Sequence, residues 1–151
     1  MPVHLTAEDI GLILRQAIPA VKEDNPVEEA RIIVAGGRGI RHQKEWEQVR
    51  KLASLLGAAV GVTRPIADLG WETPAHQIGQ TGKMVNPDVY IALGISGSMQ
   101  HMCGVKTKVL IAVNNNAAAP IMEQADYAVE ADLRTFLPAF IEQVKKIKKS
   151  R

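Results

Sequence analysis

Short runs of apolar residues alternate along this chain with stretches that have the spacing of amphipathic helices. The apolar runs, which predict strands, are Arg31–Ala35, Ala58–Thr63, Val89–Leu93, Lys108–Val113 and Tyr127–Ala131. The helical stretches are Thr6–Ile18, Glu45–Leu56, Met99–Cys103, Pro120–Gln124 and Leu133–Ile147. Because strands that alternate with helices form parallel sheets covered by those helices, the pattern predicts an α/β fold with a mostly parallel sheet.

Composition limits the class of protein further. The 151 residues, 46% hydrophobic and 23% charged, suit one globular domain with a core of its own. A formal net charge of +2 is too small to indicate a nucleic-acid partner, and no apolar run is long enough for stable membrane insertion. The single cysteine, Cys103, excludes an internal disulfide framework, and residues 1–4 do not resemble a signal peptide. We therefore expect a cytoplasmic protein.

Polar or glycine-rich residues follow every predicted strand. They are Gly37-Arg38-Gly39, Thr63-Arg64, Ser96-Gly97-Ser98, Asn114 and Asp132. Open parallel sheets bind ligands along the carboxyl edge, so these residues are expected to share one site. Arginines pair with a pyrophosphate, and serine, asparagine and aspartate bind sugar hydroxyls or an adenine edge, which favours a dinucleotide. Asn114 and Asp132 could equally be turn or helix-cap residues.

The common nucleotide-binding motifs are absent. Gly37-Arg38-Gly39 lacks the third glycine of a dinucleotide fingerprint, and Gly82-Lys83 lacks both the first glycine and the hydroxyl residue of a P-loop. The segment Arg64–Pro87, rich in glycine and proline, is expected to be one long irregular loop with a functional role.

Several motifs together carry a more specific resemblance. They are Gly-Gly-Arg-Gly at 36–39, Thr63-Arg64, Gly79-Gln80-Thr81-Gly82-Lys83, Tyr90-Ile91-Ala92, Gly94-Ile95-Ser96-Gly97, Gln100-His101 and Ala112-Val113-Asn114. From about Glu28 to Lys146 the chain resembles the FAD-binding domain of electron transfer flavoprotein alpha subunits. The resemblance implies a doubly wound sheet flanked by helices, an FAD/NAD-binding fold shared with deoxyhypusine synthase. On this basis residues 1–27 are an N-terminal helix and linker, and residues 28–151 are the FAD-binding domain.

The resemblance also implies a function. Noncovalent FAD would be the cofactor, and the chain would be an electron carrier rather than an enzyme. It would form a heterodimer with an electron transfer flavoprotein beta subunit, and take electrons from a dehydrogenase donor to a quinone-linked or other redox acceptor. An alternative is a truncated module that binds a partner subunit without redox cycling. A third possibility, an NAD-using transferase on a related fold, would depend on Lys83 or His101.

The family's FAD contacts can be carried over residue by residue. They correspond to Arg38, Thr63, Arg64, Ile78, Gly79, Gln80, Thr81, Ser96, Gly97, Ser98, Met99, Gln100, His101, Asn114, Asp132 and Leu133. By this resemblance Arg64 stabilises negative charge on reduced flavin, the Thr81 hydroxyl bonds flavin N5, and His101 donates to flavin O2. The redox potential is therefore expected to depend most on Arg64.

Some conspicuous residues are expected to be structural. Trp46 has the helical spacing of a core residue, and Trp71 is interpreted as an anchor for the loop that contains it. His101 and Cys103 are two residues apart on a predicted helix, so they do not face one another. Because no histidine–cysteine cluster has the spacing of metal ligands, we expect no metal, and we expect Cys103 to be a small buried residue.

Overall fold

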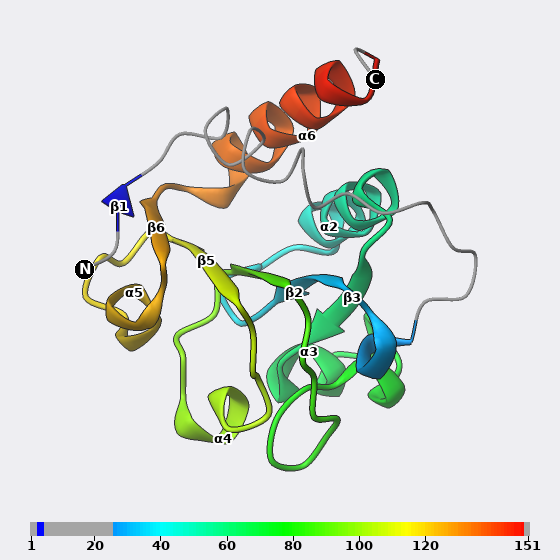
Figure 1. Ribbon diagram of the computed structural model, residues 1–151, viewed down its shortest axis with the longest axis vertical. Helices are drawn as coiled ribbons and strands as arrows, with labels where there is room; N and C mark the ends of the chain where they lie inside the picture. The colour runs from blue at the N-terminus through cyan, green and yellow to red at the C-terminus, as the bar shows by residue number, and fades with distance from the viewer. Residues whose placement is uncertain (1–2, 5–25, 150–151) are drawn as a thin grey trace.

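A parallel six-stranded sheet forms the centre of the chain, of which the computed structural model describes residues 3–4 and 26–149 (Figure 1). The strands are β1 (Val3–His4), β2 (Ile32–Gly36), β3 (Ala59–Val62), β4 (Val89–Leu93), β5 (Val109–Asn114) and β6 (Tyr127–Glu130). Their order across the sheet is β1-β6-β5-β4-β2-β3, and every neighbouring pair is parallel. The predicted α/β class and parallel sheet are therefore confirmed.

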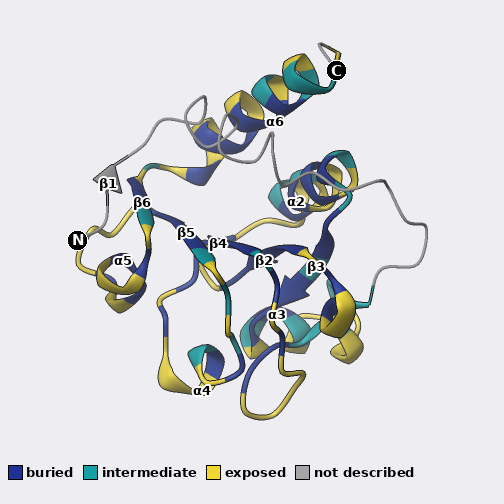
Figure 2. Cartoon of the chain, in the orientation of Figure 1, coloured by how far each residue is buried: buried dark blue, intermediate teal, exposed yellow. Residues whose placement is uncertain are grey.

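Helices cover both faces of the sheet, which explains why the strands are continuously apolar. On one face, α2 (Gln43–Leu56) and α6 (Leu133–Lys149) pack against one another and over one set of core side chains. On the other face, α5 (Pro120–Gln124) and the short helix η1 (Val27–Glu29) pack against a second set. All residues of β2 and β4 are buried, and Figure 2 shows the sheet as the most buried layer of the molecule.

The segment between β3 and β4 differs from the prediction. It is not one irregular loop, because Arg64–Asp68 form helix α3 and Pro74–His76 form the short helix η2. Both have a proline in the first turn, where a fixed φ angle favours a helix start. Each spans only one turn or slightly more, so neither produces the repeated apolar spacing that identifies a helix in a sequence. The predicted helix Thr6–Ile18 lies outside the described residues.

The order of the strands reverses direction at β2. From β2 the chain crosses to β3 at one side of the sheet, and it then returns to β4 on the opposite side of β2. Connections that leave neighbouring strands in opposite directions open a crevice at their carboxyl ends, where doubly wound proteins bind ligands. The two segments that leave this point are joined by backbone hydrogen bonds, from Gly37 N to Leu93 O (3.0 Å) and from Gly39 N to Gly94 O (2.8 Å).

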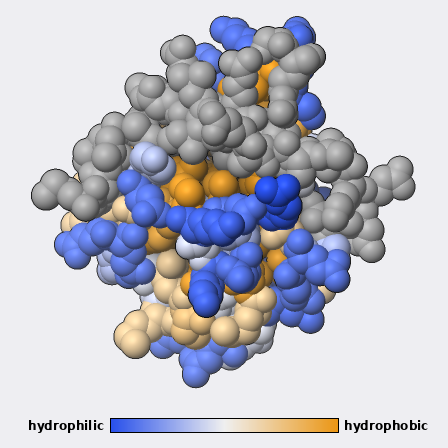
Figure 3. All heavy atoms as spheres, in the orientation of Figure 1, coloured by the Kyte–Doolittle hydropathy of each residue, from blue (hydrophilic) through white to orange (hydrophobic). Residues whose placement is uncertain are grey.

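The short helix α4 (Met99–Met102) follows this edge, and Met99 at its start is 84% exposed. Figure 3 shows weakly hydrophobic residues in the region of α4, next to strongly hydrophilic ones. No helix within residues 3–4 and 26–149 combines the length and the apolar character needed to cross a bilayer.

Candidate functional site

Two adjoining cavities form one groove along the carboxyl ends of the strands. The larger, about 500 Å³, extends from Thr63 at the end of β3, and the smaller, about 350 Å³, reaches Asp132 after β6. Five residues line both: Gly39, Arg41, Gly94, Asn114 and Asn115. The size and the position are those of a small-molecule site at the switch point of a doubly wound sheet.

Half of the predicted site residues line this groove. They are Arg38, Thr63, Ser96, Ser98, His101, Asn114, Asp132 and Leu133. Most of them follow the ends of β2, β3, β4, β5 and β6, while His101 lies in α4 and Leu133 begins α6, so the structure does bring the polar strand ends together. The other predicted residues are Arg64, Ile78, Gly79, Gln80, Thr81, Gly97, Met99 and Gln100, and they do not line either cavity.

Arg64 lies beside the groove rather than in it. It is the first residue of α3, between Thr63 and Pro65, which both line the larger cavity. Its side chain is 70% exposed and lies 3.9 Å from the carboxylate of Asp68. An exposed ion pair of this kind is weak, so the guanidinium is free to move towards a ligand.

The segment Ile78–Thr81 is held between β3 and α4 by its backbone. Ile78 N donates to Val62 O (3.0 Å), and Gln80 N donates to Gln100 O (2.6 Å). Gly79 has φ +128°, and a Cβ there would lie 2.5 Å from the Gln100 carbonyl oxygen. Only glycine therefore permits this approach of the two segments.

Polar side chains also make hydrogen bonds in the two segments that meet here, the Ile78–Thr81 segment and α4. The Thr81 hydroxyl accepts a hydrogen bond from Gln77 Nε2 at 2.8 Å. Ser98 is the N-cap residue of α4, where its hydroxyl accepts from His101 N at 3.4 Å. Gly97, which precedes it, has φ +91°, and a Cβ there would lie 2.7 Å from Ile121 Cβ. The turn from β4 into α4 therefore also requires glycine.

His101 is buried beneath this turn, and both of its ring nitrogens have partners in the chain. Nε2 lies 2.6 Å from the hydroxyl of Tyr90, and Nδ1 lies 3.2 Å from the carbonyl oxygen of Ile78. Burial lowers the pKa of His101 to about 4, although the hydrogen bond with the Ile78 backbone acts in the opposite direction. The imidazole is therefore neutral at physiological pH.

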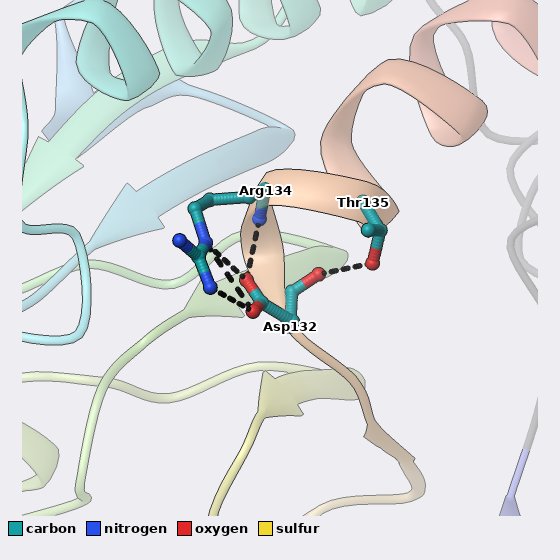
Figure 4. A network of polar contacts seen from close by, with 3 residues as sticks. All are labelled: Asp132, Arg134 and Thr135. Carbon is teal, nitrogen blue, oxygen red and sulfur yellow. Dashed lines mark hydrogen bonds and ion pairs between the residues drawn. The ribbon is translucent and has the colours of Figure 1, made fainter.

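Asn114 and Asp132 have the structural roles that their residue types suggested. Asn114 donates from Nδ2 to Ile95 O (3.1 Å) and accepts from the backbone N of Asn116 (2.9 Å). Asp132 precedes α6, and its carboxylate accepts from the backbone N of Arg134 (2.9 Å) and from the Arg134 guanidinium (Figure 4). Hydrogen bonds with Arg134 hold the pKa of Asp132 below its ordinary value. Both side chains also line the groove, so a structural role and ligand contact are compatible.

Thr63 is the residue that most directly indicates a missing partner. Its Oγ1 is buried, and it has no hydrogen-bond partner among the residues that the structure describes. Buried hydroxyl groups in proteins are nearly always paired, because an unpaired one loses its bonds to water without replacement. Since Thr63 lines the larger cavity, a polar atom of a ligand is a natural partner for this hydroxyl.

Sequence reasoning missed several residues of the groove. Arg41, Pro65, Asn115, Asn116 and Ala119 line it as well. Arg41 is the most consequential because it lines both cavities and adds a second cation close to Arg38 in the sequence. Its position two residues beyond the glycine-rich end of β2 was an available signal.

The loop after α3 is anchored by an acidic residue that the sequence did not single out. Glu72 is buried and accepts from Trp46 Nε1 (3.2 Å) and from Arg50, while His76 Nδ1 lies 2.8 Å from it. Burial raises the pKa of Glu72, but the bonds from Arg50 and Trp46 outweigh this, so the pKa lies below its ordinary value. The cluster attaches this loop to α2.

Three predictions about individual residues can be judged. Trp46 is buried in the core, as expected, and Trp71 packs against the same core side chains, which agrees with an anchoring role. The prediction for Cys103 was wrong, because Cys103 is exposed. It follows α4, a helix of only four residues that begins with the exposed Met99. Within the described residues, no group of three or more potential ligands could hold a metal ion.

Known proteins resemble most of this chain. Residues 26–106 match the family described as "Electron transfer flavoprotein FAD-binding domain". "Protein FixB" of Clostridium saccharobutylicum is 42% identical over 96% of this chain and 44% of its own length. "Electron transfer flavoprotein subunit alpha" of Thermoanaerobacterium thermosaccharolyticum is 47% identical over 81% of this chain and 37% of its own length.

A relative from a plant has a similar identity to this chain, and this chain again covers only part of its length. "Electron transfer flavoprotein subunit alpha, mitochondrial" of Arabidopsis thaliana is 43% identical over 76% of this chain and 32% of its own length. The chain thus spans less than half the length of these relatives. Together with the fold and the groove, these matches show that the chain belongs to the electron transfer flavoprotein FAD-binding domain family, whose cofactor is FAD.

Proposed function

We propose that this chain binds FAD in the groove and serves as the cofactor-holding part of an electron-carrying alpha subunit. The observation that carries the proposal is the buried, unpaired hydroxyl of Thr63, in a groove that runs past the carboxyl ends of five strands. Bound FAD would supply one- and two-electron redox chemistry, which none of the side chains in the groove can perform. The chain itself would bind the cofactor, orient it and tune its potential.

The residues present fit an elongated dinucleotide. Arg38 and Arg41 lie where β2 ends and supply the positive charge that a pyrophosphate needs. Asn114 and Asp132 line the smaller cavity and offer amide and carboxylate groups to an adenosine. Thr63 lies at the opposite end, beside Arg64. This order supports a flavin at the β3 side of the groove and an adenosine at the β6 side.

The other predicted contacts belong to this proposal as well. Arg64, Thr81 and His101 would surround the redox-active ring. Backbone and side-chain groups of the two neighbouring segments would complete that end of the site, namely Ile78, Gly79, Gln80, Ser96, Gly97, Ser98, Met99 and Gln100. Leu133 would contact the adenosine end, since it lines the smaller cavity.

We further propose the partners that the family resemblance implies: a beta subunit, a dehydrogenase donor and a quinone-linked or other redox acceptor. Exposed hydrophobic residues support a protein partner near the flavin end. Met84 follows the Ile78–Lys83 segment and is 66% exposed, and Met99 at the start of α4 is 84% exposed. The division into residues 1–27 and 28–151, the absence of substrate turnover and a cytoplasmic location are parts of the same proposal.

A redox titration of the FAD-loaded chain tests the carrier function. Absorbance recorded during stepwise reduction and reoxidation should show reversible uptake and release of electrons with the cofactor retained. Reversible cycling supports the carrier, whereas tight FAD binding with loss of the cofactor on reduction would favour the partner-binding module instead. Incubation with NAD and candidate acceptors, with product analysis, tests the absence of substrate turnover.

A further inference from the structure

Tyr90 is the second residue of β4, and its side chain reaches His101 of the short helix α4. Its side chain is fully buried, and its hydroxyl lies 2.6 Å from His101 Nε2. The two rings are 6.0 Å apart between centroids and tilted by 55°. No cavity of the groove is lined by Tyr90, so it is not a ligand contact itself.

The two hydrogen bonds of His101 define which ring nitrogen carries the proton. A backbone carbonyl can only accept, so the 3.2 Å contact with Ile78 O places the hydrogen on Nδ1. In a neutral imidazole the other nitrogen, Nε2, then has a lone pair and must accept from the Tyr90 hydroxyl. Burial also raises the pKa of Tyr90, so the hydroxyl keeps the proton that it donates.

These two hydrogen bonds join three segments of the polypeptide next to the groove. Tyr90 belongs to the rigid centre of the sheet, His101 belongs to α4, and Ile78 begins the Ile78–Thr81 segment. Because that segment is otherwise held to α4 mainly through Gln80 N and Gln100 O, the orientation of the imidazole contributes to its position.

We propose that Tyr90 is a positioning residue, which holds His101 as the neutral tautomer with its proton on Nδ1 and thereby fixes the Ile78–Thr81 segment against α4. In this tautomer His101 has no ring N–H group left for a ligand while Tyr90 is in place, which disagrees with the donation to flavin O2 that the family resemblance implies for His101. The consequence for cofactor affinity rests on the proposed function, whereas the tautomer and the loop contact do not.

Nitrogen-15 NMR of the histidine rings tests the tautomer in the full chain at pH 7. The proposal predicts a protonated Nδ1 and an unprotonated, hydrogen-bonded Nε2 for His101, with the resonances assigned from a His101→Gln variant. A proton on Nε2, or a rapid exchange between both tautomers, would overturn it. This measurement needs only the wild-type fold and no FAD.

The variant Tyr90→Phe removes one oxygen atom and keeps the buried ring. The Nε2 resonance of His101 should shift because it loses its donor, and the Gln80 amide should exchange with solvent about tenfold faster because its segment is less firmly held. FAD should bind several-fold more weakly. Tyr127→Phe is the matched control, since Tyr127 is half-buried on β6 and packs against the other set of core side chains, and it should leave the Nε2 resonance, the Gln80 exchange rate and the FAD affinity unchanged.

A double variant shows whether Tyr90 acts through His101. The amide exchange of Gln80 in Tyr90→Phe/His101→Gln should equal that of His101→Gln alone, because the bond is already absent. Additive effects, or an unchanged Nε2 resonance in Tyr90→Phe, would contradict the proposal. If the wild-type chain binds no FAD, the proposed function fails but the NMR and exchange results still decide this inference.

Discussion

Asn114 donates a hydrogen bond from Nδ2 to the carbonyl oxygen of Ile95 across 3.1 Å, and so joins the end of β5 to the glycine-rich turn after β4. The same side chain accepts from the backbone N of Asn116, which shapes the next turn. One buried amide therefore orders two of the loops that line both cavities. Its position explains how a residue can be structural and still belong to a ligand site.

Replacing Asn114 with alanine should lower both the stability of the fold and the affinity for FAD. The Ile95 carbonyl and the Asn116 N–H lose their partners, so we expect the free energy of unfolding to fall by about 2 kcal/mol in a urea titration. FAD affinity should fall about tenfold or more, with little change in the potential of the bound flavin. Asn114→Asp is the comparison, because it keeps the acceptor for Asn116 N but replaces the donor with a negatively charged oxygen that faces the Ile95 carbonyl. A large potential shift would place Asn114 at the ring instead.

The two arginines after β2 should contribute to affinity through charge. Arg38→Ala and Arg41→Ala are each expected to weaken FAD binding about tenfold, because a charge-assisted hydrogen bond to a phosphate contributes about 1.5–3 kcal/mol. Calorimetric titration at two salt concentrations measures both the loss and a reduced salt dependence. Arg31→Ala is the matched control, since Arg31 pairs with Asp88 at 3.0 Å outside the groove. Equal losses in all three variants would indicate a nonspecific effect of net charge.

Arg64 should affect the flavin potential rather than the affinity. If its exposed side chain turns from Asp68 to the ring, its positive charge stabilises the reduced, more negative cofactor. Arg64→Ala is then expected to lower the potential on the order of 50 mV, which corresponds to about 1 kcal/mol for one electron. Arg64→Lys keeps the charge and should recover most of the shift in the same spectroelectrochemical titration. An unchanged potential in Arg64→Ala removes this residue from the flavin.

The burial of His101 should make stability depend on pH. Its pKa is lowered from 6.5 to about 4 on folding, so the unfolded chain binds the proton more readily. The contribution is present in full above pH 6.5 and is lost as pH falls towards 4. The loss is on the order of 3 kcal/mol, at 1.36 kcal/mol for each unit of pKa.

Urea titrations between pH 7 and pH 4 measure this dependence. His101→Gln removes the titrating group, so the difference between the two curves isolates the contribution of His101. Parallel curves for wild type and His101→Gln would show that His101 does not stay neutral in the folded chain.

The strands were predictable because a parallel sheet with both faces covered needs continuous apolar runs, and Val89–Leu93 of β4 is a clear example. The polar residues at the strand ends were predictable for a related reason, since the fold has one ligand-binding edge. Helices α3 and η2 were not predictable from periodicity, because one turn does not repeat a pattern.

Side-chain contacts between segments that are far apart in the chain could not be predicted from the sequence. The bond between Tyr90 and His101 depends on how a strand and a short helix meet, and the pairing of Trp46 with Glu72 depends on where the loop after α3 returns to α2. Arg41 illustrates the same point, because its role follows from the course of the chain beyond Gly39 and not from a motif. Cys103 was assigned by residue type, whereas its exposure depends on the position of α4 at the surface.

The central claim is that the groove binds FAD with Thr63 as one of its contacts. The most direct test is a calorimetric titration of the chain with FAD, with AMP and NAD as competitors, for wild type and for Thr63→Val. The account predicts saturable one-to-one binding by wild type and a several-fold loss in Thr63→Val. The variant without FAD should be as stable as wild type or about 1 kcal/mol more stable, because an unpaired buried hydroxyl is removed. A folded chain that binds no FAD, or a Thr63→Val variant with unchanged affinity, would contradict it.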